Sequence, residues 1–507
     1  MPSRPTDIDR EHLDVLIVGG GLSGIGAAYH LQSKRPGKSY AVLEARERIG
    51  GTWDLFRYPG IRSDSDMYTL GYSFKPWKAA KAIADGPSIL SYIRETALEN
   101  RIDEHVRLQH RVVRADFSTA DARWNVEVRR TDTGETVHLS CGFLFLCCGY
   151  YDYEGGYTPP YPGLERFQGE FVHPQHWSDE IDYSGKHVVV IGSGATAVTL
   201  VPALAHRASH VTMLQRSPSY VISLPGTDSL AEFLRDRLPA RIAYPLVRWK
   251  NVALTMLSFQ LSRRRPSVVK ALLRRAAIKE LPPGYDVDTH FNPTYNPWDQ
   301  RLCVVPDGDL FESIRSGRAT VVTDRVTGFT ETGLELASGT ELEAELIVSA
   351  TGLQLLAFGG IQLAVDGVDV ELPRTMTYKG MMLGGVPNMA FAVGYTNASW
   401  TLKCDLTCAW TCRLLDHMDE DGYDRCVAVN HDRSVGERPL LDFSSGYILR
   451  SIDKFPRQGT KAPWRQLQNY VLDVLTLRLS RIDDGVIEFS RRVHATVPEA
   501  GGERIAA

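Results

Sequence analysis

Two stretches of the chain repeat one order of hydrophobic and polar positions: an apolar run, then glycines, then a helical pattern. The first is LDVLIVGGGLSGIGAAYHL, beginning at Leu13, and the second is KHVVVIGSGATAVTLVPAL, beginning at Lys186. Nearly every position of each apolar run is hydrophobic, as expected for a strand that a parallel sheet buries on both faces. The pattern predicts two strand–turn–helix units in one chain.

The glycines of the first unit are spaced Gly19-x-Gly21-x-x-Gly24. Such glycines permit a tight turn and let backbone N–H groups approach a pyrophosphate at the N-terminus of the helix. The next apolar run, SYAVLEAR, ends at Glu44, twenty residues past Gly24. An acid at that distance binds a ribose hydroxyl. Strand, loop, helix and acid agree, so we predict a dinucleotide site that suits FAD.

The second unit has Gly192-x-Gly194-x-x-Ala197, and its next strand, HVTMLQRSP, ends at Arg216 in place of an acid. A carboxylate would repel a ribose 2′-phosphate, whereas a guanidinium pairs with it. We therefore expect NADPH at this site. The alternative for Arg216 is a solvated surface charge.

Two further runs, FLFLCCGYY (143–151) and ELIVSATGLQ (345–354), each indicate a buried strand ending in a turn of small residues. Such turns suit crossings between nested nucleotide domains. We predict an α/β fold with two Rossmann-like domains, the second inserted into the first, plus a helical subdomain. The expected limits are 1–150 and 346–507 for the FAD domain, 151–226 and 296–345 for the linker and NADPH domain, and 227–295 for the helical insertion.

Composition narrows the class of protein. At 507 residues the chain is too long for one core, and its net charge of −4 gives no reason to expect nucleic acid. No apolar run reaches the ~18 residues of a membrane span, and MPSRPTDIDREHLD has no secretory pattern. Eight cysteines form no disulfide framework, which favours a cytoplasmic location. Cys404, Cys408 and Cys412 share a helical spacing and are interpreted as core thiols, not metal ligands.

The predicted helical insertion is basic and amphipathic, with runs such as AYPLVRWKNVALTMLSFQL and SRRRPSVVKALLRRAAIKEL. Two interpretations remain open. The helices expose an ordinary solvated face, or they make a weak peripheral contact with an anionic membrane.

Two motifs carry a resemblance to a known family. Phe167-x-Gly169-x-x-x-His173-x-x-x-Trp177 resembles the short signature of type I Baeyer–Villiger monooxygenases, although Ser178 stands where the family has Pro or Asp. A longer motif, with Gly50, Gly51, Trp53, Tyr58, Pro59, Gly60 and Asp64, resembles their second signature. With YNPWDQRLCVVPDGDLF and GYTNASWTLK, it is similar to the ethionamide-activating subgroup, from about residue 12 to 490.

The resemblance implies that NADPH and molecular oxygen are used to turn small ketones into esters or lactones through a C4a-peroxyflavin. It also implies accompanying oxidation of sulfides and thioamides. Such chemistry needs a permanent cation beside the flavin. By resemblance that cation is Arg301, and Asp64 lies against it. A structural ion pair and a loop cap are the alternatives for these two residues.

Other roles also follow from the resemblance. Gly51 and Trp53 contact a bound cofactor, and Trp400 contacts the nicotinamide ribose, with a core or surface aromatic as its alternative. In the family, a Lys that helps to hold the 2′-phosphate commonly stands at the position before Arg301. This chain has Gln300 there. Arg216 and Ser217 then carry the NADPH preference.

The short signature is expected to link the two domains and set their orientation. In this interpretation Phe167 and Trp177 anchor the segment, Gly169 permits a turn, and His173 forms a hydrogen bond across the junction. An ordinary linker is the alternative.

Three other functions stay open at this point: an S- or N-oxygenating flavin monooxygenase without ketone chemistry, an NADPH–flavin reductase, and a nucleotide-binding scaffold without turnover. The physiological substrate, the selectivity and the oligomeric state are not determined by the sequence.

Overall fold

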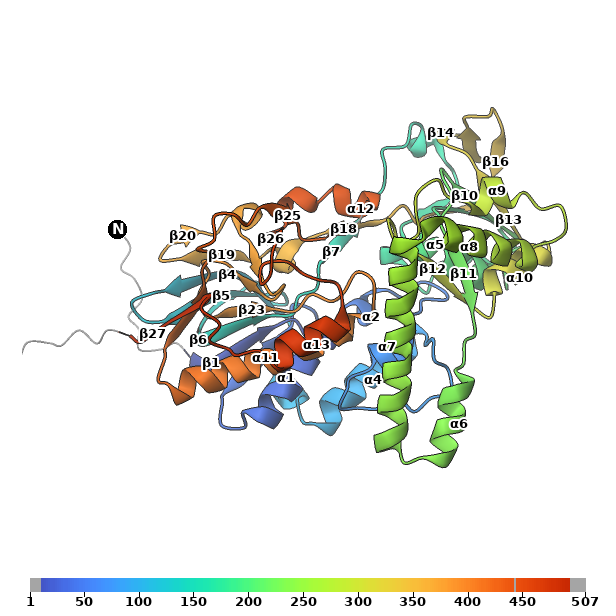
Figure 1. Cartoon of the computed structure of the whole chain (residues 1–507). Coiled ribbons are helices and arrows are strands. Elements are labelled where there is room, and N and C mark those ends of the chain that lie inside the picture. The colour runs from blue at the N-terminus through green and yellow to red at the C-terminus, as the bar shows by residue number, and fades with distance from the viewer. Residues whose placement is uncertain (1–10, 442–443, 493–507) are drawn as a thin grey trace, which may run out of the picture.

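The computed structural model describes residues 11–441 and 444–492. The first ten residues, which form most of the segment without a secretory pattern, lie outside that range. Figure 1 shows two lobes, one built from the beginning and end of the chain and the other from its middle.

The first lobe is built on a nine-stranded sheet. Its order is β20-β19-β4-β5-β6-β1-β2-β3, and β23 also pairs with β6. The strands are β1 (Glu11–Val18), β2 (Tyr40–Leu43), β3 (Val106–Arg107), β4 (His110–Ser118), β5 (Arg123–Arg130), β6 (Thr136–Leu146), β19 (Gln362–Val365), β20 (Val368–Asp369) and β23 (Met389–Phe391). Strand β1 is parallel to both β2 and β6, and its residues Leu16 and Ile17 are fully buried. The first apolar run is therefore the central strand that its pattern predicts.

Helices cover this sheet and close the first lobe. They are α1 (Leu22–Lys34), α4 (Gly86–Glu99), α11 (Trp400–Glu420) and α13 (Tyr470–Arg478). Helices α1 and α11 pack against each other, with Cys404, Cys408 and Cys412 buried on α11. Short elements complete this part: α2 (Thr52–Leu55), α3 (Met67–Leu70), β21 (Thr377–Tyr378), β22 (Met382–Leu383), β24 (Arg425–Ala428), β25 (Glu437–Pro439), α12 (Gly446–Leu449), β26 (Arg457–Gly459) and β27 (Ile487–Ser490).

The second lobe contains a parallel five-stranded sheet of order β13-β10-β9-β17-β8. Its strands are β8 (Glu170–Val172), β9 (His187–Ile191), β10 (His210–Gln215), β13 (Ala319–Thr323) and β17 (Leu346–Ser349). Helices α5 (Ala195–Leu204) and α10 (Asp309–Arg315) accompany it, with the pair β11 (Val221–Leu224) and β12 (Cys303–Pro306) and the ribbon β14 (Val326–Phe329), β15 (Gly333–Leu336) and β16 (Glu341–Glu343). Strand β9 and helix α5 match the second predicted unit.

The chain passes between the lobes twice, along neighbouring paths. Strand β7 (Tyr151–Gly156) leads out of the first lobe, and β18 (Leu353–Leu355) leads back into it. The two pair antiparallel, with Leu353 opposite Gly156. The predicted fold class, with the second nucleotide domain inserted into the first, is confirmed; the exact residue limits of the domains stay a prediction.

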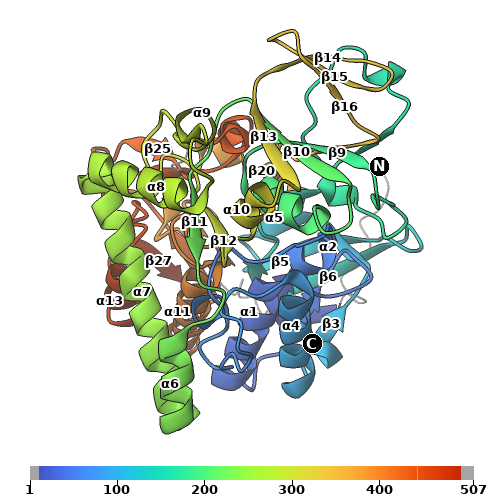
Figure 2. The same cartoon turned by 90° about the vertical axis from the view of Figure 1, so that its right-hand side faces the viewer.

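The helical insertion is also confirmed. It comprises α6 (Ser229–Arg237), α7 (Ala240–Arg264), α8 (Pro266–Glu280) and α9 (Val287–Phe291). Helix α7 runs along the outside of the molecule: it crosses the front in Figure 1 and forms the left-hand edge in Figure 2. Within the described ranges, no helix combines the length and apolarity needed to span a bilayer.

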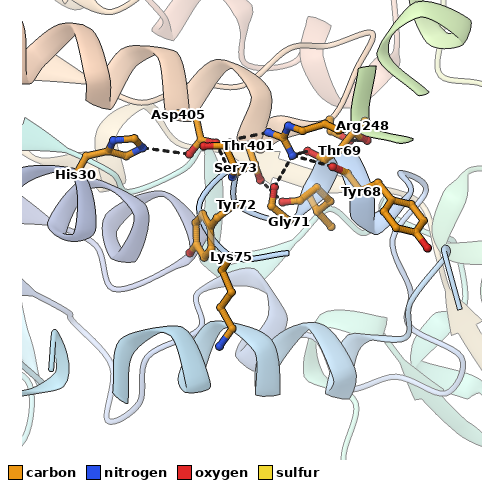
Figure 3. A network of polar contacts seen from close by, with 12 residues as sticks. His30, Tyr68, Thr69, Gly71, Tyr72, Ser73, Lys75, Arg248, Thr401 and Asp405 are labelled. Atoms are coloured by element: carbon orange, nitrogen blue, oxygen red, sulfur yellow. Dashed lines mark hydrogen bonds and ion pairs between the residues drawn. The ribbon is translucent and has the colours of Figure 1, made fainter. Parts of the chain in front are cut away.

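A buried arginine joins α7 to the first lobe (Figure 3). Arg248 is 6% exposed, and its Nη1 donates to the carbonyl oxygens of Tyr68 at 2.8 Å and Gly71 at 2.7 Å. Asn251, one turn further along α7, donates to the Asp66 carboxylate at 2.8 Å. Asp66 caps the N-terminus of α3, so α7 holds both ends of that short helix.

The same arginine reaches a buried carboxylate on α11. Arg248 Nη2 lies 3.5 Å from Asp405 Oδ2, which also accepts the Ser73 N–H at 3.0 Å. Asp405 Oδ1 lies 3.4 Å from His30 Nε2 on α1. Burial alone would raise the pKa of Asp405, but the contacts with His30, Arg248 and Ser73 outweigh it and lower that pKa. The network fixes α7, α3, α1 and α11 relative to one another.

Candidate functional site

A cavity of about 600 Å³ lies between the lobes. Its walls come from the first glycine loop, the segment from Gly50 to Ser65, the crossing strand β7, the short-signature segment and the start of α5. A volume of this size is typical of a cofactor or small-molecule site. The long signature motif and both crossings therefore meet at one cleft.

The first glycine loop leaves no room for side chains. Gly19 has φ +106°, and a Cβ there would lie 2.6 Å from the carbonyl oxygen of Cys147. A Cβ on Gly24 would overlap the carbonyl oxygen of Gly19, and Gly21 lies against Gly51 across the cleft. Because these positions keep the backbone open at the N-terminus of α1, they fit the pyrophosphate of a dinucleotide.

Glu44 follows β2 and is buried at the wall of this cleft. Its Oε2 accepts the Gly20 N–H at 2.7 Å, and its Oε1 accepts the Arg46 N–H at 3.0 Å. Burial raises the pKa of Glu44, and these hydrogen bonds oppose that shift. The two bonds fix the carboxylate where the sequence predicts a ribose contact.

The turn after β2 is held by an acid that the sequence did not single out. Asp54 is 1% exposed and forms ion pairs with Arg46 at 2.9 Å, Arg94 at 3.0 Å and Arg48 at 3.1 Å. It follows directly on the half-buried Trp53, which lines the cleft together with Gly51. Removing Asp54 would leave several cations unpaired, so it stabilises the loop that presents Gly51 and Trp53. The sequence feature that could have identified Asp54 is its position directly after Trp53 in the GGTWD motif.

The later residues of the long signature pack against the second lobe. Tyr58 is buried in the core of the second lobe, with its neighbour Phe56. A Cβ on Gly60 would lie 2.8 Å from the carbonyl oxygen of Thr199 on α5. Arg62 then forms an ion pair with Asp309 at the start of α10, at 2.5 Å. The segment before Asp64 thus packs against the second lobe. The sequence analysis did not identify Arg62 or Asp309 as contact residues.

The second glycine loop repeats the geometry of the first. Gly192 has φ +145° and lies against the carbonyl oxygen of Ala350, just after β17. A Cβ on Gly194 would meet open space, and Ala197 is fully buried on α5. The backbone of this loop is therefore accessible at a helix N-terminus, as a second dinucleotide requires.

Arg216 directly follows β10, the strand beside β9, and is exposed. No ion pair involves it in the described part of the chain. The adjacent Ser217 accepts a hydrogen bond from Ser193 Oγ through its carbonyl oxygen, at 3.0 Å. A free guanidinium next to the glycine loop fits a 2′-phosphate.

Arg301 and Asp64 both line the cleft. The nearby Tyr150, Tyr151, Tyr447 and Asp64 outweigh the opposing effect of burial and raise the pKa of Arg301, so the guanidinium stays charged. Burial raises the pKa of Asp64, while Arg301 and Arg62 oppose that shift. The two residues interact electrostatically, but no ion pair within 4.0 Å joins them among the described residues. Gln300 is half-buried beside Arg301.

The segment that carries Arg301 is irregular and is fixed by a residue that the sequence analysis missed. The Asp299 carboxylate accepts the N–H of Asn296 at 3.1 Å and pairs with Arg263 of α7 at 2.9 Å. The Asp299 carbonyl oxygen accepts the N–H of Ser444 at 3.1 Å. Asp299 therefore ties this segment to the helical insertion and to the C-terminal part of the first lobe.

Trp400 begins α11 and lines the cleft. Its indole N–H donates to Ser23 Oγ of α1 at 2.8 Å, and its ring lies 5.1 Å from that of Tyr150. The N–H is thus engaged inside the first lobe, and the ring lies against Gly394.

The short signature forms a compact connector. Phe167 packs against Phe329 at 5.8 Å, and Trp177 packs against Tyr183 at 6.0 Å. The backbone bends at Gly169, although this glycine does not have a positive φ. A Cβ there would overlap the Phe167 ring and lie 2.7 Å from the carbonyl oxygen of Glu345, so the glycine is needed for close approach.

His173 contacts both crossing strands. Its Nε2 lies 3.1 Å from the carbonyl oxygen of Gly352, and its Nδ1 accepts the Gln175 N–H at 3.2 Å. These partners assign the proton to Nε2, which donates to Gly352. The ring also lies directly against Gly156 of β7. Burial lowers the pKa of His173, which keeps the ring neutral.

Comparison with known proteins defines the class. Residues 82–383 match the flavin-binding monooxygenase-like family, and residues 17–82 match the NAD(P)-binding Rossmann-like domain. The first match covers more than half of the chain, so the protein belongs to the flavin-binding monooxygenase-like family.

Within this family the chain is similar to the FAD-containing monooxygenase EthA. It is 54% identical over 483 residues to EthA of Mycobacterium tuberculosis (strain H37Rv), covering 95% of this chain and 98% of the relative. It is 52% identical over 482 residues to EthA of Mycolicibacterium smegmatis, with the same coverage. An oxidized steroid monooxygenase bound to NADP has a TM-score of 0.75 at 20% identity, covering 95% of this chain and all of that structure; this shows the shared fold.

The resemblance to type I Baeyer–Villiger monooxygenases and their ethionamide-activating subgroup is therefore confirmed. The protein is an FAD- and NADPH-dependent monooxygenase. The residues of both loops fit these groups.

Proposed function

We propose that this enzyme inserts oxygen into small ketones to give esters or lactones, and that it also oxidises sulfides and thioamides. Bound FAD supplies the redox chemistry that passes electrons from NADPH to dioxygen. The proposal is supported above all by one observation: the cleft between the two nucleotide loops contains Arg301, a permanently charged and mostly enclosed cation.

Arg301 is proposed to stabilise negative charge during oxygen transfer. When the carbonyl carbon of a ketone is attacked, charge develops on its oxygen, and a fixed cation lowers the energy of that state most effectively where water is excluded. Arginine suits this role because it does not release its proton. The hydrogen bonds of Asp299 keep the preceding segment in place, so the guanidinium needs little reorganisation.

Asp64 is proposed to tune that cation. Its carboxylate interacts with Arg301 without contacting it, and Arg62 anchors the same segment on the second lobe through Asp309. Arg301 stands just before β12 of that lobe, so both groups are held against the same side of the cleft. Asp64 is therefore proposed to orient the guanidinium and to moderate its charge.

NADPH is proposed to be selected by Arg216 and Ser217, since Gln300 cannot contribute a charge to the 2′-phosphate. Trp400 is proposed to offer its ring face to the nicotinamide ribose. His173 is proposed to set the orientation of the two domains, because it contacts both crossing strands.

The test compares Arg301→Ala and Arg301→Lys with Arg129→Ala, which removes an exposed arginine on β5, away from the cleft. Product formation from cyclic and linear ketones and from sulfides is measured together with NADPH use. We expect both Arg301 variants to lose ~10²–10³ in ketone oxygenation, while NADPH oxidation continues with release of hydrogen peroxide. An Arg301→Ala enzyme that forms ester at the wild-type rate would refute the role.

The same assay decides the substrate class. Sulfoxide without any ester or lactone would identify an S- or N-oxygenating monooxygenase. NADPH oxidation fully matched by hydrogen peroxide, with no organic product, would identify a flavin reductase.

A further inference from the structure

The outer surface of the helical insertion is unusually apolar. In the described part of the chain 21 large hydrophobic side chains are exposed, and 11 of them lie on α6, α7 and α8. Four more lie on α13 or directly after it. Isolated exposed leucines are normal, but a concentration of this kind marks an interaction surface.

On α7 these side chains form one stripe. The exposed positions recur every three or four residues along its length: Ile242, Leu246, Trp249, Ala253, Leu257 and Leu261. Leu257 is 67% exposed, and Leu254 beside the stripe is 58% exposed. Spacing of three and four places them on one side of a helix. The helix therefore has two apolar sides, of which only one is covered.

The covered side already accounts for the attachment of α7. Tyr244, Val247, Val252 and Met256 are buried, and Arg248 is bonded to the first lobe as Figure 3 shows. Apart from Trp249, whose ring packs against Tyr470, the exposed stripe has no ring contact or ion pair with the first lobe among the described residues. Its leucines are consequently not explained by folding.

Helix α13 extends this surface. The rings of Trp249 and Tyr470 lie 5.6 Å apart, so α7 and α13 are neighbours, as both Figures 1 and 2 show. Leu472 and Leu475 on α13 are 42% and 50% exposed. Together α7 and α13 form what we call the outer helical face.

Charge identifies the partner of this face. Residues 239–279 contain ten Lys and Arg and no Asp or Glu, whereas the whole chain has a net charge of −4. Four of the ten are paired: Arg248 with Asp405, Lys250 with Asp228, Arg263 with Asp299, and Arg274 with Asp288. Five are exposed without an ion-pair partner among the described residues: Arg241, Arg264, Arg265, Arg275 and Lys279.

We propose that the outer helical face lies on an anionic lipid surface, with the stripe of α7 inserted among the acyl chains and the free cations against the headgroups. Leucine and tryptophan flanked by arginine and lysine are the composition of helices that lie in the plane of a membrane interface. A second copy of the same face is a poorer partner, because it would bring the same unpaired cations against one another. The proposal does not depend on the substrate of the enzyme.

Co-sedimentation of the holoenzyme with vesicles tests the proposal. Vesicles of phosphatidylcholine alone are compared with vesicles that also contain phosphatidylglycerol, at low and high salt. We expect binding to the anionic vesicles only, weakened by salt because screening shortens the range of the attraction. No binding to anionic vesicles at low salt would overturn the proposal.

Variants test the basic residues and the apolar residues of the surface separately. Neutralising Arg264 and Arg265 to Gln should lower the vesicle partition coefficient about fivefold per charge. Leu257→Gln should lower it about tenfold. Val368→Gln and Arg129→Gln, exposed positions on β20 and β5, are the matched controls and should leave it unchanged. If the control variants lower the partition coefficient as much as the variants of Arg264, Arg265 and Leu257, the outer helical face is not the membrane-binding surface.

Analytical ultracentrifugation without lipid tests the alternative that a second copy of the chain binds the outer helical face. If the wild type self-associates, Leu257→Gln abolishes that association, and neither protein binds vesicles, then the outer helical face is an interface between copies and the lipid proposal fails.

Discussion

Replacing Arg248 with methionine tests how the helical insertion is fixed to the first lobe. Methionine keeps an unbranched apolar stem but has no hydrogen-bond donor. The change leaves the buried carbonyl oxygens of Tyr68 and Gly71 without their donors and removes one partner of Asp405. The perturbation is confined to one side chain that lies outside the cofactor cleft.

The magnitude follows from the geometry. A buried acceptor left unsatisfied costs about 1–3 kcal/mol, and two short hydrogen bonds to carbonyl groups are lost. Breaking a buried ion pair costs about 3–5 kcal/mol, but Arg248 and Asp405 are 3.5 Å apart and Asp405 keeps Ser73 and His30. We therefore expect the free energy of unfolding to fall by about 4 kcal/mol, a large part of the ~5–15 kcal/mol of a folded domain.

Urea unfolding of the holoenzyme, followed by circular dichroism and flavin fluorescence, measures this loss. Arg241→Met removes an exposed arginine from the same helix and should change the stability by less than about 0.5 kcal/mol. Arg248→Lys should recover only part of the loss, because one ammonium group does not span the same carbonyls as a guanidinium. Equal urea midpoints for Arg248→Met and Arg241→Met would show that the buried network does not hold α7 in place.

Three further predictions concern the two glycine-loop units and the connector that contains His173. Gly24→Ala forces a Cβ onto the carbonyl oxygen of Gly19, so the purified variant should hold much less flavin per protein, whereas Gly37→Ala, where a Cβ meets open space, should hold the wild-type amount. Arg216→Gln should raise the KM for NADPH about tenfold or more by removing a charged contact, with little change in the KM for NADH; equal shifts for both would exclude Arg216 from 2′-phosphate binding. Burial lowers the folded-state pKa of His173, so its contribution to stability is complete above about pH 6.5 and is lost as the pH falls below that, where the unfolded chain takes up the proton first. Urea midpoints at about pH 7.5 and 5.5 should accordingly differ more for the wild type than for His173→Asn, which cannot titrate.

The sequence by itself determined the elements that depend on local order. Unbroken apolar runs followed by Gly19 and Gly192 specify buried strands, tight turns and helix starts, because backbone conformation and burial of neighbouring residues act over short distances. Glu44 and Arg216 could be placed for the same reason, since each ends the strand that follows its loop. The helical insertion was recognisable from its period of three and four.

Only the tertiary structure decided how distant segments meet. Asp54 pairs with Arg94, forty residues further along the chain, Asp299 joins the Arg301 segment to α7, and Arg62 pairs with Asp309 almost 250 residues away. Nothing in local periodicity encodes such pairs, because each depends on how distant segments pack together. Gly169 shows the same limit: its close approach to the backbone of Glu345 exists only once the two segments have packed together.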